Sequence, residues 1–163
     1  MFTVLDGHMA RRYSQMRVVL QRVNHGNVVV EDKEIGKIGK GYVLLVGVAE
    51  GDTEKEADYL AKKISQLRIF EDENEKMNLD IHQVGGSILS ISQFTLLADT
   101  KKGNRPSFIK SAHPDEALKL YHYFNQQLRN YELEVSEGEF GSHKLVSLEN
   151  DGPVTIFFDT DHK

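Results

Sequence analysis

Asn150-Asp151-Gly152-Pro153-Val154-Thr155-Ile156, close to the C-terminus, is the stretch around which the rest of the chain is organised. It joins two runs, 144–148 and 154–158, that are predicted to be strands. Proline fixes its own φ and has no N–H, so it does not fit a central ladder. Glycine tolerates backbone angles that other residues avoid. The Gly152-Pro153 pair therefore predicts a rigid corner that presents backbone carbonyls. This corner is either an ordinary strand-to-strand turn or a functional device with a cis peptide bond.

The composition predicts a single-domain globular protein. A chain of 163 residues is long enough for a substantial core, and 39% hydrophobic with 28% charged residues is ordinary for a soluble domain. The absence of cysteine excludes disulfides, thiolate zinc sites and a cysteine nucleophile. No apolar run approaches the ~20 residues that cross a bilayer, and the N-terminus lacks a signal-peptide core. We therefore expect a cytoplasmic protein with no membrane partner.

The net charge of −5 argues against broad coating of nucleic acid, which depends on many contacts between cations and phosphates. One local cluster suits a small RNA contact: Lys101, Lys102 and Arg105 in a loop that contains glycine, with Lys110 just beyond. A solvated loop is the alternative interpretation, because charge runs usually indicate no more than that.

Residues 1–15 show no strand or helix period, and Gly7-His8-Met9 resembles a cloning scar. We interpret them as an N-terminal extension, either a tag or a segment outside the domain, which then spans residues 16–163.

Within the domain the pattern predicts strands before the first helix, which favours an antiparallel start. A turn is expected at 24–27. Thr53 and Glu56 have capping-box spacing at the start of the first helix, and Pro114 suits the start of the second. The predicted strands are 17–23, 28–30, 35–38, 42–48, 69–70, 87–91, 133–135, 144–148 and 154–158, and the predicted helices are 53–68 and 114–128.

The strand at 87–91 continues into Ser92-Gln93-Phe94-Thr95-Leu96, where polar side chains interrupt an apolar run. Such side chains must find partners or face a cavity. Thr95 as a nucleophile would need an activating base, and the spacing nominates none of the seven histidines. Backbone N–H groups at the strand end would instead suit an oxyanion. Plain strand termination is the alternative interpretation.

Taken together, the two motifs resemble one known family. Ser92-Gln93-Phe94-Thr95-Leu96 resembles the signature of the D-aminoacyl-tRNA deacylases, and the 150–155 stretch resembles that family's Gly-cisPro motif. The similarity runs from Met16 to about Phe158. Supporting stretches are Gln21-Arg22-Val23, Arg68-Ile69-Phe70, Lys76-Met77-Asn78-Leu79 and Gly103-Asn104-Arg105-Pro106-Ser107-Phe108.

The resemblance implies hydrolysis of the ester that joins a D-amino acid to the 3′-terminal adenosine of tRNA. It also implies removal of glycine mischarged on tRNA for alanine. The partners implied are the tRNA acceptor end and a second copy of the chain, in a homodimer whose Gly-Pro motifs enter the partner's active site. The expected fold is α+β: a curved, mainly antiparallel sheet, partly closed like a barrel, with two helices packed outside.

The resemblance also assigns residues near the reacting ester. The backbone N–H groups of Phe94 and Thr95 are the oxyanion candidates, with the terminal ribose 2′-OH helping to activate water. Gln93 and Ser92 would shape the site. No metal or organic cofactor is implied, and no metal-ligand pattern is visible.

Further residues are assigned to substrate binding. Gly152 and Pro153 would accept hydrogen bonds from the substrate's α-ammonium group, and Arg22 would brace that corner. An exposed charge at a strand edge is the alternative interpretation of Arg22. Ala112 and Phe140 would line the pocket, although core packing also explains Phe140. Family members often carry a methionine shortly after Phe140, whereas this chain has Ser142-His143-Lys144 there.

Two other functions stay open on sequence alone. A non-catalytic RNA-binding module would bind tRNA without releasing an amino acid. A general Thr-dependent esterase would act on simple esters and would lose all activity on Thr95→Ala.

Overall fold

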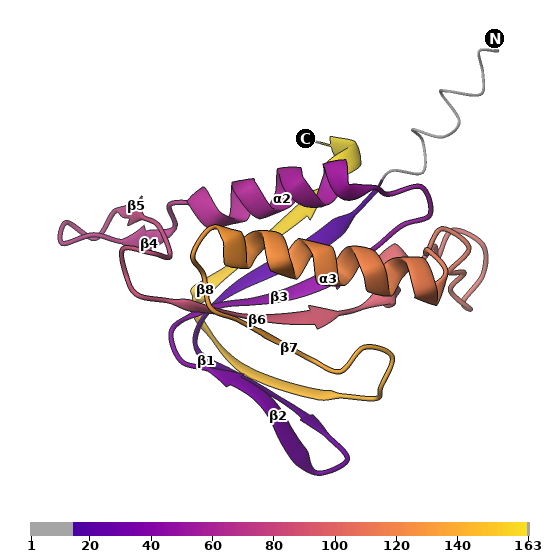
Figure 1. The fold of residues 1–163 in the computed structure, drawn as a ribbon, viewed down its shortest axis with the longest axis horizontal. Coiled ribbons are helices and arrows are strands. Elements are labelled where there is room, and N and C mark those ends of the chain that lie inside the picture. Colours follow the sequence, from indigo (N-terminus) through magenta and orange to yellow (C-terminus); the bar gives the residue numbers. More distant parts are fainter. Residues whose placement is uncertain (1–14, 163) are drawn as a thin grey trace, which may run out of the picture.

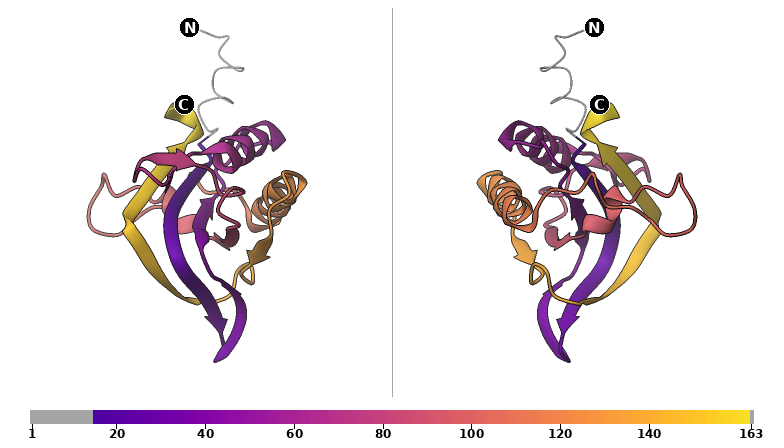
Figure 2. Two further views of the ribbon diagram at one scale, coloured as in Figure 1. Left: turned by 90° about the vertical axis from the view of Figure 1, so that its left-hand side faces the viewer. Right: turned by 90° about the vertical axis from the view of Figure 1, so that its right-hand side faces the viewer.

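Two helices cover one face of a strongly bent, six-stranded sheet (Figures 1 and 2). The structure, a computed structural model, describes residues 15–162, so all of the predicted N-terminal extension except Gln15 lies outside the described residues. The elements are β1 (Arg17–Val30), β2 (Lys33–Ile38), β3 (Gly41–Gly47), α2 (Glu54–Gln66), β4 (Phe70–Glu71), β5 (Met77–Leu79), β6 (Ser87–Ser92), the 3₁₀ helix η1 (Phe94–Leu97), α3 (Pro114–Asn130), β7 (Val135–Glu137), β8 (Leu145–Asp159) and the 3₁₀ helix η2 (Thr160–His162).

The strands run in the order β2-β1-β3-β6-β7, and β8 also pairs with β1, which nearly closes the sheet into a barrel. β1 is antiparallel to β2, β3 and β8, whereas β6 is parallel to both β3 and β7. The parallel pair β3–β6 is joined by a crossover that contains α2, as parallel neighbours require. The predicted α+β fold, with a curved and mainly antiparallel sheet under two helices, is confirmed.

The prediction of a turn at residues 24–27 is wrong. β1 passes through it as one strand of 14 residues, in which Gly26 and Asn27 pair with β2 on one side and with β8 on the other. A Cβ on Gly26 would stand 2.9 Å from Val43 Cγ2, so the glycine allows close packing of neighbouring strands. A glycine in a strand interior often marks such a close approach, and here it resembled a turn signal.

The two strands expected at 144–148 and 154–158 are also one strand, β8, because both halves pair antiparallel with β1. Gln21 lies opposite Thr155 and Val23 lies opposite Asn150, so residues 151–154 bulge out opposite Arg22. The Gly-Pro corner is therefore a bulge within a strand and not a turn between two strands. Its peptide bond is cis, as the resemblance implied.

Both helices begin at residues that the sequence predicts. Thr53 and Glu56 form the expected capping box at the start of α2, and Pro114 lies in the first turn of α3. The Tyr121 hydroxyl of α3 donates a 2.6 Å hydrogen bond to the carbonyl oxygen of Ser90 in β6, which fixes the helix on the sheet. The fully buried side chains of this core include Tyr42, Tyr121, Phe124, Leu60, Ile64 and Ile88.

The parallel strands β3 and β6 end at the same edge of the sheet, and η1 lies across that edge. The Gln93 N–H donates to the Val46 carbonyl oxygen at 2.7 Å, so β6 remains tied to β3 up to the start of η1. A Cβ on Gly47 would lie 2.7 Å from Leu97 Cδ2, which shows how closely η1 packs on the end of β3. The fold thereby fixes the first turn of η1 at this edge.

Candidate active site

The Ser92–Leu97 segment carries its polar and aromatic side chains on the surface. Ser92 ends β6, Gln93 is extended, and η1 then turns Phe94 and Thr95 outward while Leu97 is buried. The Phe94 side chain is 57% exposed, which is unusual for a large aromatic residue at a strand end. Arg17 Nη1 donates to the Leu96 carbonyl oxygen at 2.8 Å and holds the far end of η1.

Two adjacent backbone N–H groups at the start of η1 are available to a ligand. The first N–H groups of a helix have no partner within it. The Gln93 N–H donates to the Val46 carbonyl oxygen, and the Leu96 N–H donates to the Gln93 carbonyl oxygen at 3.3 Å. Within residues 15–162, neither the Phe94 N–H nor the Thr95 N–H has a hydrogen-bond acceptor. A pair of neighbouring donors of this kind can stabilise negative charge on one oxygen.

The Thr95 side chain contacts an amide and no base. Gln93 Nε2 lies 2.9 Å from Thr95 Oγ1. An amide does not abstract a proton near neutral pH. Among the described residues no histidine or carboxylate is hydrogen-bonded to this hydroxyl. The geometry lacks the activation that a threonine nucleophile needs.

An aromatic pair flanks the two N–H groups. The Phe94 and Phe108 rings meet edge to face, with centroids 4.9 Å apart. Asp99 and Ser107 exchange two backbone hydrogen bonds of 2.8 Å, which close the loop between the rings. Phe108 belongs to the Gly103–Phe108 stretch that supports the family resemblance, but its place beside Phe94 could not be predicted from spacing.

Arg22 holds the Gly-Pro corner from beneath, where its side chain is only 4% exposed. Its guanidinium donates to the Asp151 carbonyl oxygen at 3.2 Å and to the Ile69 carbonyl oxygen at 2.5 Å. The same group forms ion pairs with Glu71 Oε2 at 3.1 Å and with Asp151 Oδ2 at 3.5 Å. Arg22 therefore joins the corner to the β4 segment and is not an exposed strand-edge charge.

Asn150 and Gly152 complete the corner. Asn150 Oδ1 accepts a 3.0 Å hydrogen bond from the Val154 N–H, and its Nδ2 donates to Thr155 Oγ1 at 2.9 Å. Gly152 has φ +125°, and a Cβ there would meet Val154 Cγ2 at 2.9 Å and Arg22 Nη2 at 3.1 Å. Only glycine suits this position. Gly152 and Pro153 themselves are exposed.

One chain does not bring the corner to the Ser92–Leu97 segment. Arg17 at the start of β1 touches η1, whereas Arg22, five residues further along β1, touches the corner. At roughly 3.3 Å per residue the backbone positions of Arg17 and Arg22 lie about 16 Å apart along the strand. Within one chain the predicted catalytic residues and the Gly152–Pro153 corner thus lie in separate places.

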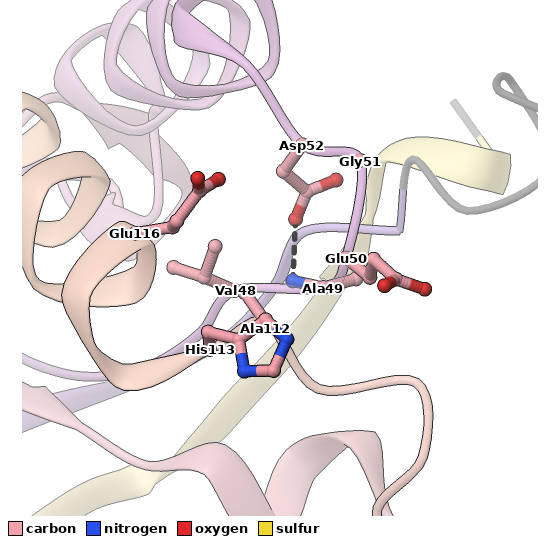
Figure 3. A pocket seen from close by; sticks show the side chains of 8 residues that line it. All are labelled: Val48, Ala49, Glu50, Gly51, Asp52, Ala112, His113 and Glu116. Carbon is pink, nitrogen blue, oxygen red and sulfur yellow. Dashed lines mark hydrogen bonds between the residues drawn. The ribbon is translucent and has the colours of Figure 1, made fainter.

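Ala112 lines a hollow of about 220 Å³ next to the end of β3 (Figure 3). Its N–H donates to the Val48 carbonyl oxygen at 3.0 Å. Asp52, His113 and Glu116 also line this hollow, whereas Ser92 to Thr95 do not. Asp52 Oδ2 accepts a 2.6 Å hydrogen bond from the Ala49 N–H, and burial raises the pKa of Asp52 to about 7. Neither the sequence pattern nor the resemblance nominates Asp52.

Phe140 packs beside Tyr121, with ring centroids 6.0 Å apart, and its half-buried position agrees with the core-packing interpretation. The Lys144 side chain packs over Gly138, where an added Cβ would lie 3.2 Å from Lys144 Cδ. Lys144 Nζ donates a 2.9 Å hydrogen bond to the Ser142 carbonyl oxygen. The residues that replace the family's methionine thus contact their own loop. Residues 15–162 contain no group of three or more His, Asp or Glu side chains arranged to hold a metal ion.

Comparison with known proteins gives a consistent match. A family model described as D-Tyr-tRNA(Tyr) deacylase matches residues 19–159. The D-aminoacyl-tRNA deacylase of Bifidobacterium animalis subsp. lactis is 57% identical over 155 residues, which cover 90% of this chain and 98% of that protein. The D-aminoacyl-tRNA deacylase of Staphylococcus aureus is 54% identical over 145 residues, covering 89% of this chain and 96% of that protein.

Solved structures share the fold. A protein described as c-Myc DNA unwinding element binding protein superposes with a TM-score of 0.81 at 38% identity, over 87% of this chain and 97% of that chain. A probable eukaryotic D-amino acid tRNA deacylase superposes with a TM-score of 0.76, over 89% of this chain and 99% of that chain. At 20% identity this second likeness supports the fold alone.

Proposed function

The chain belongs to the D-Tyr-tRNA(Tyr) deacylase family and is a hydrolase of D-aminoacyl-tRNA, and from this premise we propose where and how the ester is cleaved. The reaction takes place at the start of η1, and the Gly152–Pro153 corner of a second copy completes the site. The enzyme acts in the cytoplasm, where aminoacyl-tRNA is used. No helix among the described residues is long and apolar enough to span a membrane.

The pair of free N–H groups is the observation that carries this proposal. When water attacks the ester carbonyl, negative charge develops on the carbonyl oxygen, and the donors of Phe94 and Thr95 stabilise it. The C–O bond to the terminal ribose then breaks, the ribose 3′-oxygen takes a proton, and the amino acid leaves as a carboxylic acid. Since an aminoacyl ester is already labile, positioning and oxyanion stabilisation provide the acceleration.

Water is the nucleophile in this proposal, and the ribose 2′-OH of the substrate assists in activating it. The Thr95 hydroxyl contacts the Gln93 amide and no base, which argues against a Thr-dependent general esterase. Ser92 and Gln93 shape the site beside the two donors. A non-catalytic RNA-binding module is disfavoured because the relatives over nearly the whole chain are deacylases.

The corner must come from a second copy if it contacts the substrate. The α-ammonium group is bonded to the carbon next to the ester carbonyl, so both ends of the aminoacyl group lie within a few bond lengths. The separation of about 16 Å along β1 is too large for one chain to contact both. The corner is exposed and Arg22 holds its backbone rigidly, which suits insertion into another molecule.

The outer edge of β8 provides a surface for such a homodimer. Among the strands of residues 15–162, β8 pairs with β1 on one side and with none on the other, and exposed edge strands tend to associate. Leu145 and Phe157, near the two ends of β8, are 61% and 57% exposed, so each half of the strand presents an apolar side chain at its surface. In this proposal the same strand forms the interface and carries the corner.

The corner selects the chirality of the substrate. The exposed backbone at Gly152 and Pro153 offers carbonyl acceptors, and Pro153 adds no N–H that would repel an ammonium group. Once the α-ammonium group is fixed there, an L side chain meets rigid backbone and a D side chain points away. Glycine has no side chain, so glycyl-tRNA mischarged on tRNA for alanine is also a substrate.

A proline substitution tests the N–H pair directly. Phe94→Pro removes one proposed donor and is compatible with the extended Gln93 before it. We expect kcat on D-Tyr-tRNA to fall about 10²- to 10³-fold, as for the loss of one oxyanion donor. Phe94→Ala is the matched control, because it removes the same ring and keeps the N–H. Equal activities of the two variants would refute the proposed role of the donor.

Mixing two defective variants tests the arrangement in trans. Phe94→Pro lacks the donor and Gly152→Ala distorts the corner, so each homodimer is impaired. In a mixed dimer, one site combines an intact donor pair with an intact corner. Subunit exchange at equal concentrations should restore about one quarter of the wild-type activity. If exchange is verified by mass and no activity returns, the corner does not act on the partner's site.

A further inference from the structure

Residues 99–110, which we call the basic loop, concentrate positive charge next to the candidate active site. They contain Lys101, Lys102, Arg105 and Lys110, with Asp99 as their one carboxylate. The whole chain shows the opposite balance, with 25 acidic residues against 20 Lys and Arg. The positive charge of the basic loop is therefore a local departure from an acidic protein.

The cations of the basic loop are not neutralised by ion pairs. Within residues 15–162 none of the four forms an ion pair with a carboxylate, whereas the buried Arg22 does. Asp99 is engaged by the loop's own backbone, because its Oδ1 accepts a 3.0 Å hydrogen bond from the Lys101 N–H. This hydrogen bond, together with the nearby Lys110, Lys101 and Lys102, lowers the pKa of Asp99. The positive charge consequently faces solvent from Lys101 to Arg105.

Three sets of contacts fix the basic loop beside η1. Asp99 and Ser107 close it with their two backbone hydrogen bonds, and Phe108 packs against Phe94. The Lys110 carbonyl oxygen accepts a 2.8 Å hydrogen bond from the Glu50 N–H at the end of β3. Figure 2 shows the loop standing out on the side of the molecule opposite the helices. The segment that carries these cations is thus fixed beside η1.

We propose that the basic loop binds the phosphates of the tRNA acceptor end that precede the terminal adenosine. This inference rests on the proposed deacylation site at the start of η1. A substrate esterified there must pass its last phosphodiesters close to the loop. Arginine grips phosphate with a planar fork and lysine with a point charge, so the loop offers both kinds of contact. Three or four contacts suit a chain whose net charge of −5 disfavours a larger RNA footprint.

The test compares two triple variants with the same change in charge. The first is Lys101→Gln/Lys102→Gln/Arg105→Gln. The control is Lys33→Gln/Lys37→Gln/Lys40→Gln. Lys33 and Lys37 are exposed on β2, and the exposed Lys40 precedes β3, whose opposite end lies against η1. Affinity for uncharged tRNA is measured from 50 to 300 mM salt, so the result does not depend on catalysis.

For the loop variant we expect binding about 10- to 100-fold weaker at 0.1 M salt, with the salt slope shallower by about 2, since each phosphate contact contributes about 0.7 to 0.9. The control should keep the wild-type slope. An unchanged slope in the loop variant, or an equal loss in the control, would overturn the proposal. So would a changed oligomeric mass with unchanged tRNA affinity, because the loop would then contact protein.

A small substrate separates this inference from the proposed function. Both the wild type and the loop variant should hydrolyse 3′-(D-tyrosyl)adenosine at the same rate, because this ester carries no acceptor-stem phosphates. An equal loss on the small ester and on tRNA would show that the loop acts on the active site and would overturn the proposal. If the wild type cleaves neither substrate, the proposed function fails, and the tRNA affinities still decide the role of the loop.

Discussion

Replacing Arg22 by methionine should destabilise the fold and loosen the Gly-Pro corner together. Methionine keeps an unbranched side chain at this position but removes the guanidinium, whose carbon lies 5.9 Å from the centroid of the Phe70 ring, and with it every polar contact. The carbonyl oxygens of Ile69 and Asp151 lose a charged donor, and each such hydrogen bond is worth about 1.5–3 kcal/mol. The carboxylates of Glu71 and Asp151 are 43% and 44% exposed, so water replaces the guanidinium there and those pairs contribute less than about 1 kcal/mol each. We therefore expect a loss of about 3–6 kcal/mol, most of it from the two carbonyl contacts.

Urea unfolding and thermal melting measure this loss. For a domain of this size 3–6 kcal/mol corresponds to a fall in Tm of about 6–24 °C. Arg68→Met is the matched control, because the exposed Arg68 donates to the neighbouring Asn78 carbonyl oxygen, and it should cost less than about 1 kcal/mol. The ratio of D-Tyr-tRNA to L-Tyr-tRNA hydrolysis should also fall in Arg22→Met alone. A stability within 1 kcal/mol of the wild type, with an unchanged ratio, would refute the bracing role.

Three further predictions concern single side chains. Thr95→Ala should keep substantial deacylase activity in a tRNA deacylation assay, whereas replacing the terminal 2′-OH of the tRNA by hydrogen should be more damaging; an acyl-enzyme trapped on Thr95 would contradict this. Folding raises the pKa of Asp52 to about 7, so the folded state holds the proton more tightly and stability falls as pH rises from about 4 to 7. Asp52→Asn should match the wild type at pH 4 and exceed it by about 4 kcal/mol at pH 8 in urea titrations. Gly152→Ala should cost about 1–3 kcal/mol, because its Cβ would crowd Arg22 at φ +125°, whereas Gly39→Ala meets open space and should cost less than 1; equal melting temperatures for the two would contradict the packing account.

The parts of the fold that follow local rules could be predicted from the sequence. The capping box at Thr53 and the proline at the start of α3 act within one helical turn, so residue spacing was sufficient. The interior of β3 is almost wholly apolar, and the structure buries it between neighbouring strands. These signals depend on neighbours in sequence and not on the path of the whole chain.

The errors arose where a residue serves a distant partner. Gly26 permits the close approach of β3, and from sequence alone it could not be distinguished from a turn glycine. The corner at 151–154 divides β8 in the sequence, but β1 pairs with both halves and keeps the strand in one direction. Register between strands far apart in sequence is set by the assembled sheet, so the bulge could be identified only in the structure.

The candidate site follows the same division. The motif at Ser92–Leu96 was recognisable because its residues are contiguous, whereas Phe108 and Asp52 reach the same edge of the sheet from separate loops. Arg17 supports η1 through the Leu96 carbonyl oxygen across 79 positions of sequence. No local pattern predicts a contact of that kind, because it depends on how β1 crosses the sheet.

The separation of donors and corner along β1 has a consequence for proofreading. The N–H pair at the start of η1 belongs to one chain and is fixed by β3 and Arg17, so a monomer retains the proposed oxyanion donors. If the corner acts in trans, the same monomer lacks the backbone that excludes L side chains. Discrimination between D and L esters would then depend on dimer concentration, as any property of an associated state does. Hydrolysis of the labile ester would require only the local geometry of η1, so an active site split in this way confines chiral selection to the assembled dimer.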